Sequence, residues 1–170
     1  MKIEVKRNYL SISKISDLIE QSAPSIHCKV ELLNPPNFHI NKFFYKQIGK
    51  KHRWIDRLVW EDEKWMKYLN NSNIKTFILK EKDDLIGYFE QIYNKNKSNC
   101  EIAYFGILEN FFGKKYGGYL LSEAIKISLD QNINKLWVHT CSLDHKNALK
   151  NYLSRGMKIY KSEKINLEID

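Results

Sequence analysis

The sequence is poor in glycine, proline and cysteine, and it contains no long apolar run. Seven glycines and three prolines among 170 residues exclude collagen-like and other low-complexity repeats. The three cysteines, Cys28, Cys100 and Cys141, are odd in number and lack CxxC spacing, so neither a disulfide framework nor a zinc knuckle is indicated. No segment approaches the roughly 18 apolar residues of a membrane-spanning helix, and the N-terminus has no apolar signal core. We therefore expect a cytoplasmic protein without a membrane partner.

The composition that is present suits one packed domain over residues 1–170. Hydrophobic residues make up 43% of the chain and aromatic residues 13%, which is enough for a sizeable core. The net charge is +8, and residues 1–60 carry most of the excess, with 11 Lys or Arg against 5 Asp or Glu. A basic nucleic-acid-binding domain is one hypothesis for this charge. Because no helix-turn-helix, zinc-finger or RNA-binding signature accompanies it, we expect no nucleic-acid partner.

Local patterns predict alternating strands and helices. The expected strands are a short one near the N-terminus, Cys28–Leu33, Lys75–Lys80, Leu85–Tyr93, Glu101–Leu108, Leu136–Cys141 and Lys158–Leu167. Helices are expected at Ile15–Gln21, Phe38–Ile48, Glu61–Leu69, the stretch up to Leu129 and the stretch containing Tyr152. An antiparallel meander followed by strand, helix, strand, helix and strand is an α+β order.

The stretch from Glu101 to Leu129 is the most informative part of the chain. It reads as a strand, a glycine-containing loop with two lysines, and an amphipathic helix. A turn that opens a helix presents free backbone N–H groups at the positive end of the helix dipole, which predicts an anion site. The spacing fits neither a nucleotide P-loop, GxxxxGK followed by Ser or Thr, nor the dinucleotide turn GxGxxG.

This segment resembles motif A of the GNAT superfamily of acetyl-CoA-dependent N-acetyltransferases, whose loop reads Q/R-x-x-G-x-G/A after a strand. Phe112 takes the Q/R place, Lys115 the first glycine and Gly117 the G/A. Two of the three signature places are therefore departures from the pattern. A side chain in the glycine place favours an alternative hypothesis, a non-catalytic acyl-CoA-binding or regulatory module, if Lys115 adopts a positive φ and its side chain fills the loop.

The segment Trp137–Met157 resembles motif B of the same superfamily, N-x-x-A-x-x-x-Y-x-x-x-G-F after a strand. Ala148, Tyr152 and Gly156 match at fixed offsets, while His145 replaces the Asn and Met157 the Phe. Phrases such as YFGIL and WVHTCSLDH are similar to a GNAT subgroup with an HTCxLDHPxAL-like motif B.

The resemblance implies an α+β, GNAT-like fold: a mixed, mostly antiparallel sheet of about six to seven strands flanked by about four helices, splayed between the two motif strands. It implies acetyl-CoA as co-substrate and no metal. The residues implied to bind acetyl-CoA are Phe105, Gly106, Ile107, Phe112, Gly113, Lys114, Lys115, Tyr116, Gly117, Gly118 and His145.

The resemblance also supplies candidates for catalysis. Tyr152 occupies the place of the general acid, and its alternative is a ring packed on the sheet. Glu101 and His139 are both candidates for the general base. The alternative for Glu101 is a solvated charge at the start of a strand, and the alternative for His139 is a hydrogen-bonded histidine that fills the sheet. Asp144 is expected to cap the following helix. Cys141 is expected to be a small buried apolar residue, although a nucleophile paired with a histidine is the alternative.

Trp54 and Arg57 fall in the region that lines the acceptor pocket of GNAT folds. They are candidates for substrate binding, with a core Trp and a structural ion pair as the equal alternatives. The expected function is transfer of an acetyl group from acetyl-CoA to a primary amine of a small molecule or protein, by direct attack in a ternary complex. The identity of the amine, the acyl-chain preference and the oligomeric state, a homodimer included, stay open.

Overall fold

The structure, a computed structural model, describes residues 1–168, and within them seven strands form one sheet flanked by four α-helices. The strands are β1 (Lys2–Ile12), β2 (Cys28–Leu32), β3 (Ile74–Glu81), β4 (Asp84–Asn94), β5 (Asn99–Ile107), β6 (Lys135–Cys141) and β7 (Lys158–Glu168). The helices are α1 (Phe38–Gly49), α2 (Asp62–Leu69), α3 (Tyr116–Leu129) and α4 (Ala148–Ser154). The expected mixed α+β architecture is confirmed.

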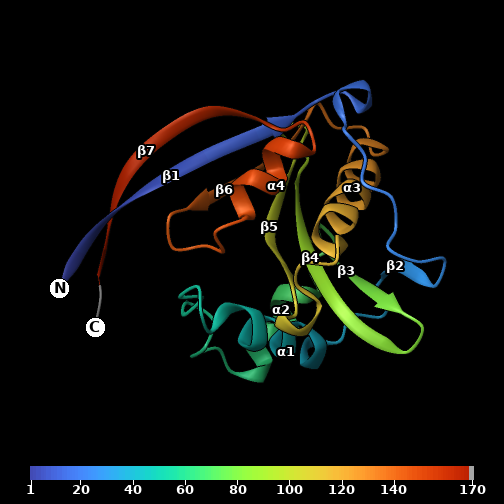
Figure 1. The fold of residues 1–170 in the computed structure, drawn as a ribbon. Helices are drawn as coiled ribbons and strands as arrows, with labels where there is room; N and C mark the ends of the chain where they lie inside the picture. Colours follow the sequence, from blue (N-terminus) through green and yellow to red (C-terminus); the bar gives the residue numbers. More distant parts are fainter. Residues whose placement is uncertain (169–170) are drawn as a thin grey trace.

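The strand order is β2-β3-β4-β5-β6-β1-β7, and every neighbouring pair is antiparallel except β5 and β6. The N-terminal strand β1 therefore lies between the last two strands of the chain. Figure 1 shows β1 and β7 side by side as a long two-stranded ribbon that curves away from the rest of the sheet. Because this pairing joins the two ends of the sequence, no local pattern predicts it.

Helices cover both faces of the sheet. Successive side chains of a strand point to opposite faces, so a single strand can pack against helices on both sides. Phe77 and Leu79 of β3 pack in the larger core together with Leu120, Leu121 and other residues of α3. Ile78, between them, packs on the other side with residues of α1. Within the described residues, no helix is long and apolar enough to cross a membrane.

The helix predicted at Ile15–Gln21 is wrong. Only a single 3-10 turn, Ile15–Asp17, forms there, and the chain then continues in an extended form. Tertiary hydrogen bonds account for the difference: Ile19 N donates to Arg155 O at 2.9 Å, and Gln21 N donates to Ser122 Oγ of α3 at 2.9 Å. Backbone groups that find partners elsewhere do not need a helix to satisfy them.

Candidate active site

A bulge in β5 opens the middle of the sheet. The register between β4 and β5 shifts between Glu90 and Gln91, which leaves Ala103 without a partner on β4. A bulge bends its strand and increases the local twist. The pairing of β5 with β6 ends just before it, at Glu101 opposite Trp137. The two parallel strands therefore diverge beyond this point.

The divergence leaves one edge of β5 free. Phe105, Gly106 and Ile107 pair with β4 on one side and with no described strand on the other. A crevice of about 960 Å³ lies along this edge. Its walls come from the motif A loop, α4, β6 and the segment after α1. All the predicted site residues border this crevice except Lys114, which is exposed.

The loop before α3 has the features of an anion site. The backbone N–H groups of Tyr116, Gly117 and Gly118 belong to the first turn of α3 and have no partner within the helix. They stand at the positive end of the helix dipole. Gly113, at φ +74°, is open on its outer side, with nothing within 4 Å of the place where a Cβ would stand. The loop therefore offers free donors and room for a phosphate group.

Lys115 adopts the left-handed conformation that glycine favours, with φ 70° and ψ 8°. Lys115 is exposed, so its side chain does not fill the loop. One of the two conditions for the alternative hypothesis is thus met and the other is not. A non-glycine residue in this conformation costs about 1–2 kcal/mol.

Arg155 lies against the same helix end, and sequence reasoning missed it. A Cβ on Gly118 would stand only 2.6 Å from Arg155 Nη1. The Nε atom of Arg155 is buried without a hydrogen-bond partner. Burial lowers the pKa of the guanidinium. An unpaired cation beside the positive end of a helix is unfavourable by itself, and an anion bound between them would offset this cost.

Tyr152 of α4 faces the crevice from below the free edge of β5. The residue is buried, and its ring meets that of Phe105 in an edge contact at 6.3 Å. Its hydroxyl makes no hydrogen bond with any described residue. Burial, followed by the charge of Asp144, raises the pKa of Tyr152 above its ordinary value of 10.0. The phenol therefore stays protonated across the neutral range.

Asp144 does not cap α4, so that prediction is wrong. The N-cap is Asn147, and no side chain bonds to the cap. The Asp144 carboxylate instead accepts hydrogen bonds from Thr140 Oγ1 and from Cys141 N at 3.0 Å. It closes the turn that follows β6, and α4 begins without a side-chain cap.

Aromatic rings form one wall of the crevice where the family pattern has polar residues. Phe112 contacts the ring of His145 at 4.8 Å, and His145 lies 5.8 Å from the ring of His52. Burial, with the neighbouring His52 and Lys146, lowers the pKa of His145. The imidazole is consequently neutral at pH 7.

The two candidate bases stand on neighbouring strands. Glu101 lies where β5 and β6 separate, and its carboxylate makes no hydrogen bond or ion pair with a described residue. Burial alone raises the pKa of Glu101 above the ordinary 4.5. His139 is two residues further along β6 from Trp137 and is more exposed. Loss of hydration and the charge of Arg7 lower the pKa of His139. Burial thus shifts the pKa values of the two groups in opposite directions, because it disfavours the charged form of each.

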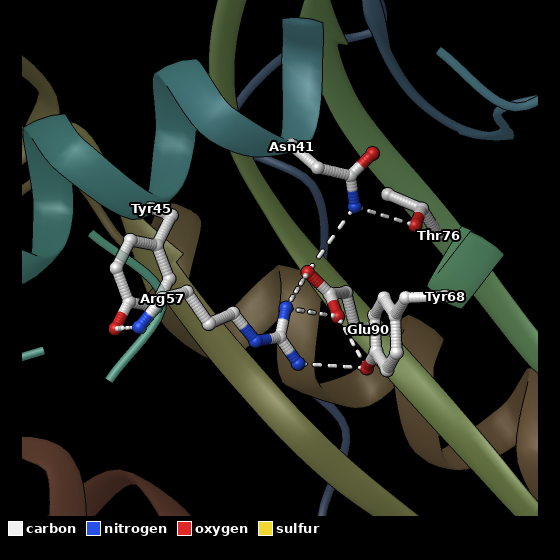
Figure 2. A network of polar contacts seen from close by, with 6 residues as sticks. All are labelled: Asn41, Tyr45, Arg57, Tyr68, Thr76 and Glu90. Atoms are coloured by element: carbon white, nitrogen blue, oxygen red, sulfur yellow. Dashed lines mark hydrogen bonds and ion pairs between the residues drawn. The ribbon is translucent and has the colours of Figure 1, made fainter. Parts of the chain in front are cut away.

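Arg57 lies in a buried polar network that sequence reasoning offered only as an alternative. The residues of this network, shown in Figure 2, are Asn41, Tyr45, Arg57, Tyr68, Thr76 and Glu90. Arg57 Nη1 donates to Glu90 Oε1 at 2.9 Å, and Nη2 donates to Tyr68 Oη at 2.8 Å. Desolvation by itself would lower the pKa of Arg57, but the attraction and hydrogen bond of Glu90, together with Tyr68 and Tyr104, raise it.

The Arg57 network fixes the segment after α1 that borders the crevice. The backbone N–H of Arg57 donates to Tyr45 Oη of α1 at 3.0 Å. The half-buried Trp54, three residues earlier, packs on Tyr104 of β5 at 5.0 Å and leaves no room for a Cβ on Gly49. The segment is therefore tied to α1 and to the sheet.

No group of three or more His, Cys, Asp or Glu residues within 1–168 is arranged to hold a metal ion. Cys141 is partly buried, borders the crevice and follows His139 on the same face of β6.

A family model described as the acetyltransferase (GNAT) family matches residues 31–157. The match leaves β1 and β7 outside. A search of curated proteins finds no match for the sequence.

Several solved structures share the fold. An aminoglycoside acetyltransferase from an uncultured soil metagenomic sample, in complex with trehalose, has a TM-score of 0.65 and 16% identity, covering 78% of this chain and 90% of that one. An IAA acetyltransferase from Bacillus cereus has a TM-score of 0.57 and 20% identity, covering 79% of each chain. A GCN5-related N-acetyltransferase from Kribbella flavida has a TM-score of 0.67 and 10% identity, covering 97% of this chain. The present chain spans only 58% of that protein's length, and 61% of a functionally unknown conserved protein from Staphylococcus epidermidis.

We predict that Glu90→Gln lowers the free energy of unfolding by about 3 kcal/mol or more, because it leaves the buried Arg57 guanidinium without its counter-charge. Chemical denaturation followed by tryptophan fluorescence measures the change. The matched control is Asp62→Asn, which breaks the surface pair with Lys42 and is expected to cost less than about 1 kcal/mol. Equal effects of the two changes would contradict a structural role for the Arg57 network.

We predict that Lys115→Gly raises the free energy of unfolding by about 0.5–1 kcal/mol, because relief of the left-handed strain exceeds the added chain entropy of glycine. Thermal denaturation monitored by circular dichroism gives the comparison. Lys114→Gly is the control, because Lys114 has no positive φ whose strain glycine could relieve. This variant should be less stable than the wild type. A lower stability for Lys115→Gly would show that the loop does not carry this strain.

Proposed function

The chain belongs to the acetyltransferase (GNAT) family, and we propose that it transfers an acetyl group from acetyl-CoA to a primary amine by direct attack in a ternary complex. The observation that carries the proposal is the free edge of β5 beside the open N-terminus of α3. A thioester with a phosphate-bearing tail needs both features: strand amides for the arm and helix amides for the phosphates.

The chain's own groups divide the binding task as follows. The backbone amides from Gly113 to Gly118 hold the phosphates, and Arg155 adds the positive charge that Phe112 lacks. The edge of β5 at Phe105–Ile107 pairs with the amide groups of the pantetheine arm. A backbone N–H of this edge stabilises the negative charge that develops on the thioester oxygen. The phenyl ring of Phe112 and the imidazole of His145 cover one side of the bound molecule.

Proton transfers by two side chains and by solvent complete the reaction. Glu101 takes a proton from the acceptor ammonium, directly or through one water, which frees the lone pair of the nitrogen. The nitrogen–carbon bond then forms, the nitrogen gives its second proton to solvent, and the carbon–sulfur bond breaks. Tyr152 gives its phenolic proton to the departing thiolate and recovers one from solvent. The position of Glu101 at the point where the strands diverge favours it over His139 as the base.

A non-catalytic acyl-CoA-binding module is the second candidate. The positive φ of Lys115 in the glycine place favours it, because a side chain there departs from the glycine that the family's loop pattern has at this position. The two candidates share acetyl-CoA binding and differ in turnover. The neighbours named for aminoglycosides and for IAA indicate how far acceptors vary on this fold, so they do not choose the amine.

We predict that Tyr152→Phe lowers the turnover of acetyl-CoA by about a hundredfold and leaves its binding affinity nearly unchanged, as expected of a general acid. Release of free thiol measures turnover with a panel of amines, and calorimetric titration measures affinity. An unchanged rate would remove Tyr152 from this role. A wild-type protein that binds acetyl-CoA without any turnover would support the binding module, and one that binds none would overturn both candidates.

We predict that Glu101→Gln lowers kcat/KM by about a hundredfold and abolishes its fall at acidic pH. In the wild type this fall should have a midpoint above the ordinary pKa of 4.5, because burial raises the pKa of Glu101. The raised pKa also means that the stability contributed by Glu101 is present at low pH and lost as the pH rises through that pKa. At pH 7 the Gln variant should therefore be more stable than the wild type.

The matched control for this experiment is Glu109→Gln, which removes an exposed carboxylate paired with Lys51. It should leave the pH profile of kcat/KM unchanged. Persistence of the acidic fall in Glu101→Gln, together with its loss in His139→Gln, would transfer the role of base to His139.

A further inference from the structure

Arg7 of β1, like Arg155, borders the crevice with a buried Nε that has no hydrogen-bond partner, and it lies far in the sequence from both motifs. β1 places it opposite Cys141 of β6 on one side and Glu163 of β7 on the other. Its side chain borders the crevice together with His139 and Cys141. Because His139 and Cys141 are two residues apart on β6, they lie on the same face of the sheet, the face on which the amine must enter.

The hydrogen bond from Tyr9 lowers the pKa of Glu163, and the charge of Arg7 adds to this effect from a longer distance, but no ion pair among the described residues neutralises Arg7. Its Nε atom is buried and has no hydrogen-bond partner, and its guanidinium forms no ion pair with a described residue. The nearest register partner, Glu163, is already engaged: Tyr9 Oη donates to it at 2.6 Å, and Lys161 Nζ lies at 3.3 Å. A buried donor on a charged group that stays unpaired costs free energy. A bound anion would recover that cost.

The position of Arg7 relative to Glu101 defines what the ligand must look like. Glu101 is level with Trp137 on β6, and Arg7 is level with Cys141, so about 13 Å of strand separates the two levels. The crevice thus has an unpaired carboxylate at its narrow end and an unpaired guanidinium at its wide end. Three other carboxylates, Asp56, Asp144 and Glu168, also border the crevice. Asp56 and Glu168 are exposed, and Asp144 already accepts hydrogen bonds from Thr140 and Cys141.

We propose that Arg7 binds a carboxylate of the acceptor, so that the substrate is an amine that also carries a carboxylate. This inference rests on the proposed acetyl transfer and names the class of its acceptor. The guanidinium is suited to this task because its planar fork accepts a carboxylate through two parallel hydrogen bonds. The ammonium end of the same molecule then points toward Glu101 and the free edge of β5. A polycationic amine would be repelled at the wide end.

The test compares aminocarboxylates of increasing length, each with its uncharged carboxamide, in the wild type and in three variants. Arg7→Gln removes the charge, Arg7→Lys keeps the charge without the fork, and Lys6→Gln removes a neighbouring charge from the opposite face of β1. We expect the wild type to prefer the acid over its amide by about tenfold to a hundredfold in kcat/KM. Arg7→Gln should reduce kcat/KM for the acid to the value for the amide, and it should leave kcat/KM for the amide unchanged.

Arg7→Lys should retain part of the preference, and Lys6→Gln should retain all of it. A wild type that acetylates acid and amide equally, or prefers spermidine to both, would overturn the proposal. An equal fall for acid and amide in Arg7→Gln would do the same. Circular dichroism tests whether each variant is folded. If Arg7→Gln does not fold, the preference for acid over amide is compared between the wild type and Arg7→Lys.

A binding experiment separates this proposal from the proposed function. Calorimetry measures the affinity of each acid and its amide for the protein, with and without CoA. Tighter binding of the acid that is lost in Arg7→Gln supports the role of Arg7 even if no amine is acetylated, whereas equal binding of acid and amide overturns it. Failure of acetyl transfer itself is recognised separately, by the absence of thiol release with every amine.

Discussion

The divergence of β5 from β6 is the constraint on which the rest of the site depends. Two parallel strands that stayed paired would use their backbone groups on one another and leave none for a ligand. The extra residue Ala103 bends β5 away just after Glu101, and the edge from Phe105 to Ile107 becomes available. The crevice, the exposed end of α3 and the approach to Tyr152 all follow from this one bend.

Keeping the strands apart requires support from both faces of the sheet. On one face, α3 and α4 pack into the larger core and bring the phosphate loop and Tyr152 to the crevice. On the other, the Arg57 network joins α1, α2, β3 and β4, and it fixes the segment around Trp54. Its ion pair joins residues 33 positions apart through a fully buried carboxylate. The geometry of this side of the crevice is thus held by a buried ion pair.

Three charges that face the crevice form no ion pair with a described residue. Arg155 stands beside the N-terminus of α3, Arg7 stands at the wide end, and Glu101 stands where the strands separate. Each would be stabilised by a bound counter-charge. Buried groups that fold without partners are the ones that a ligand can satisfy, and here their signs alternate along the crevice: positive, negative, positive.

The sequence by itself determined the strand–loop–helix of motif A, the matched spacing of motif B and therefore the family, because these signals depend on residues close together in the chain. It also located most of the crevice wall through those motifs. It misjudged Ile15–Gln21 and Asp144, since backbone and carboxylate groups there bond to distant or unexpected partners. Only the tertiary structure decided that β1 lies between β6 and β7, that Arg57 pairs with Glu90, and that Arg7 and Arg155 face the crevice. Those outcomes depend on which buried charges find a partner across the fold, and no local pattern carries that information.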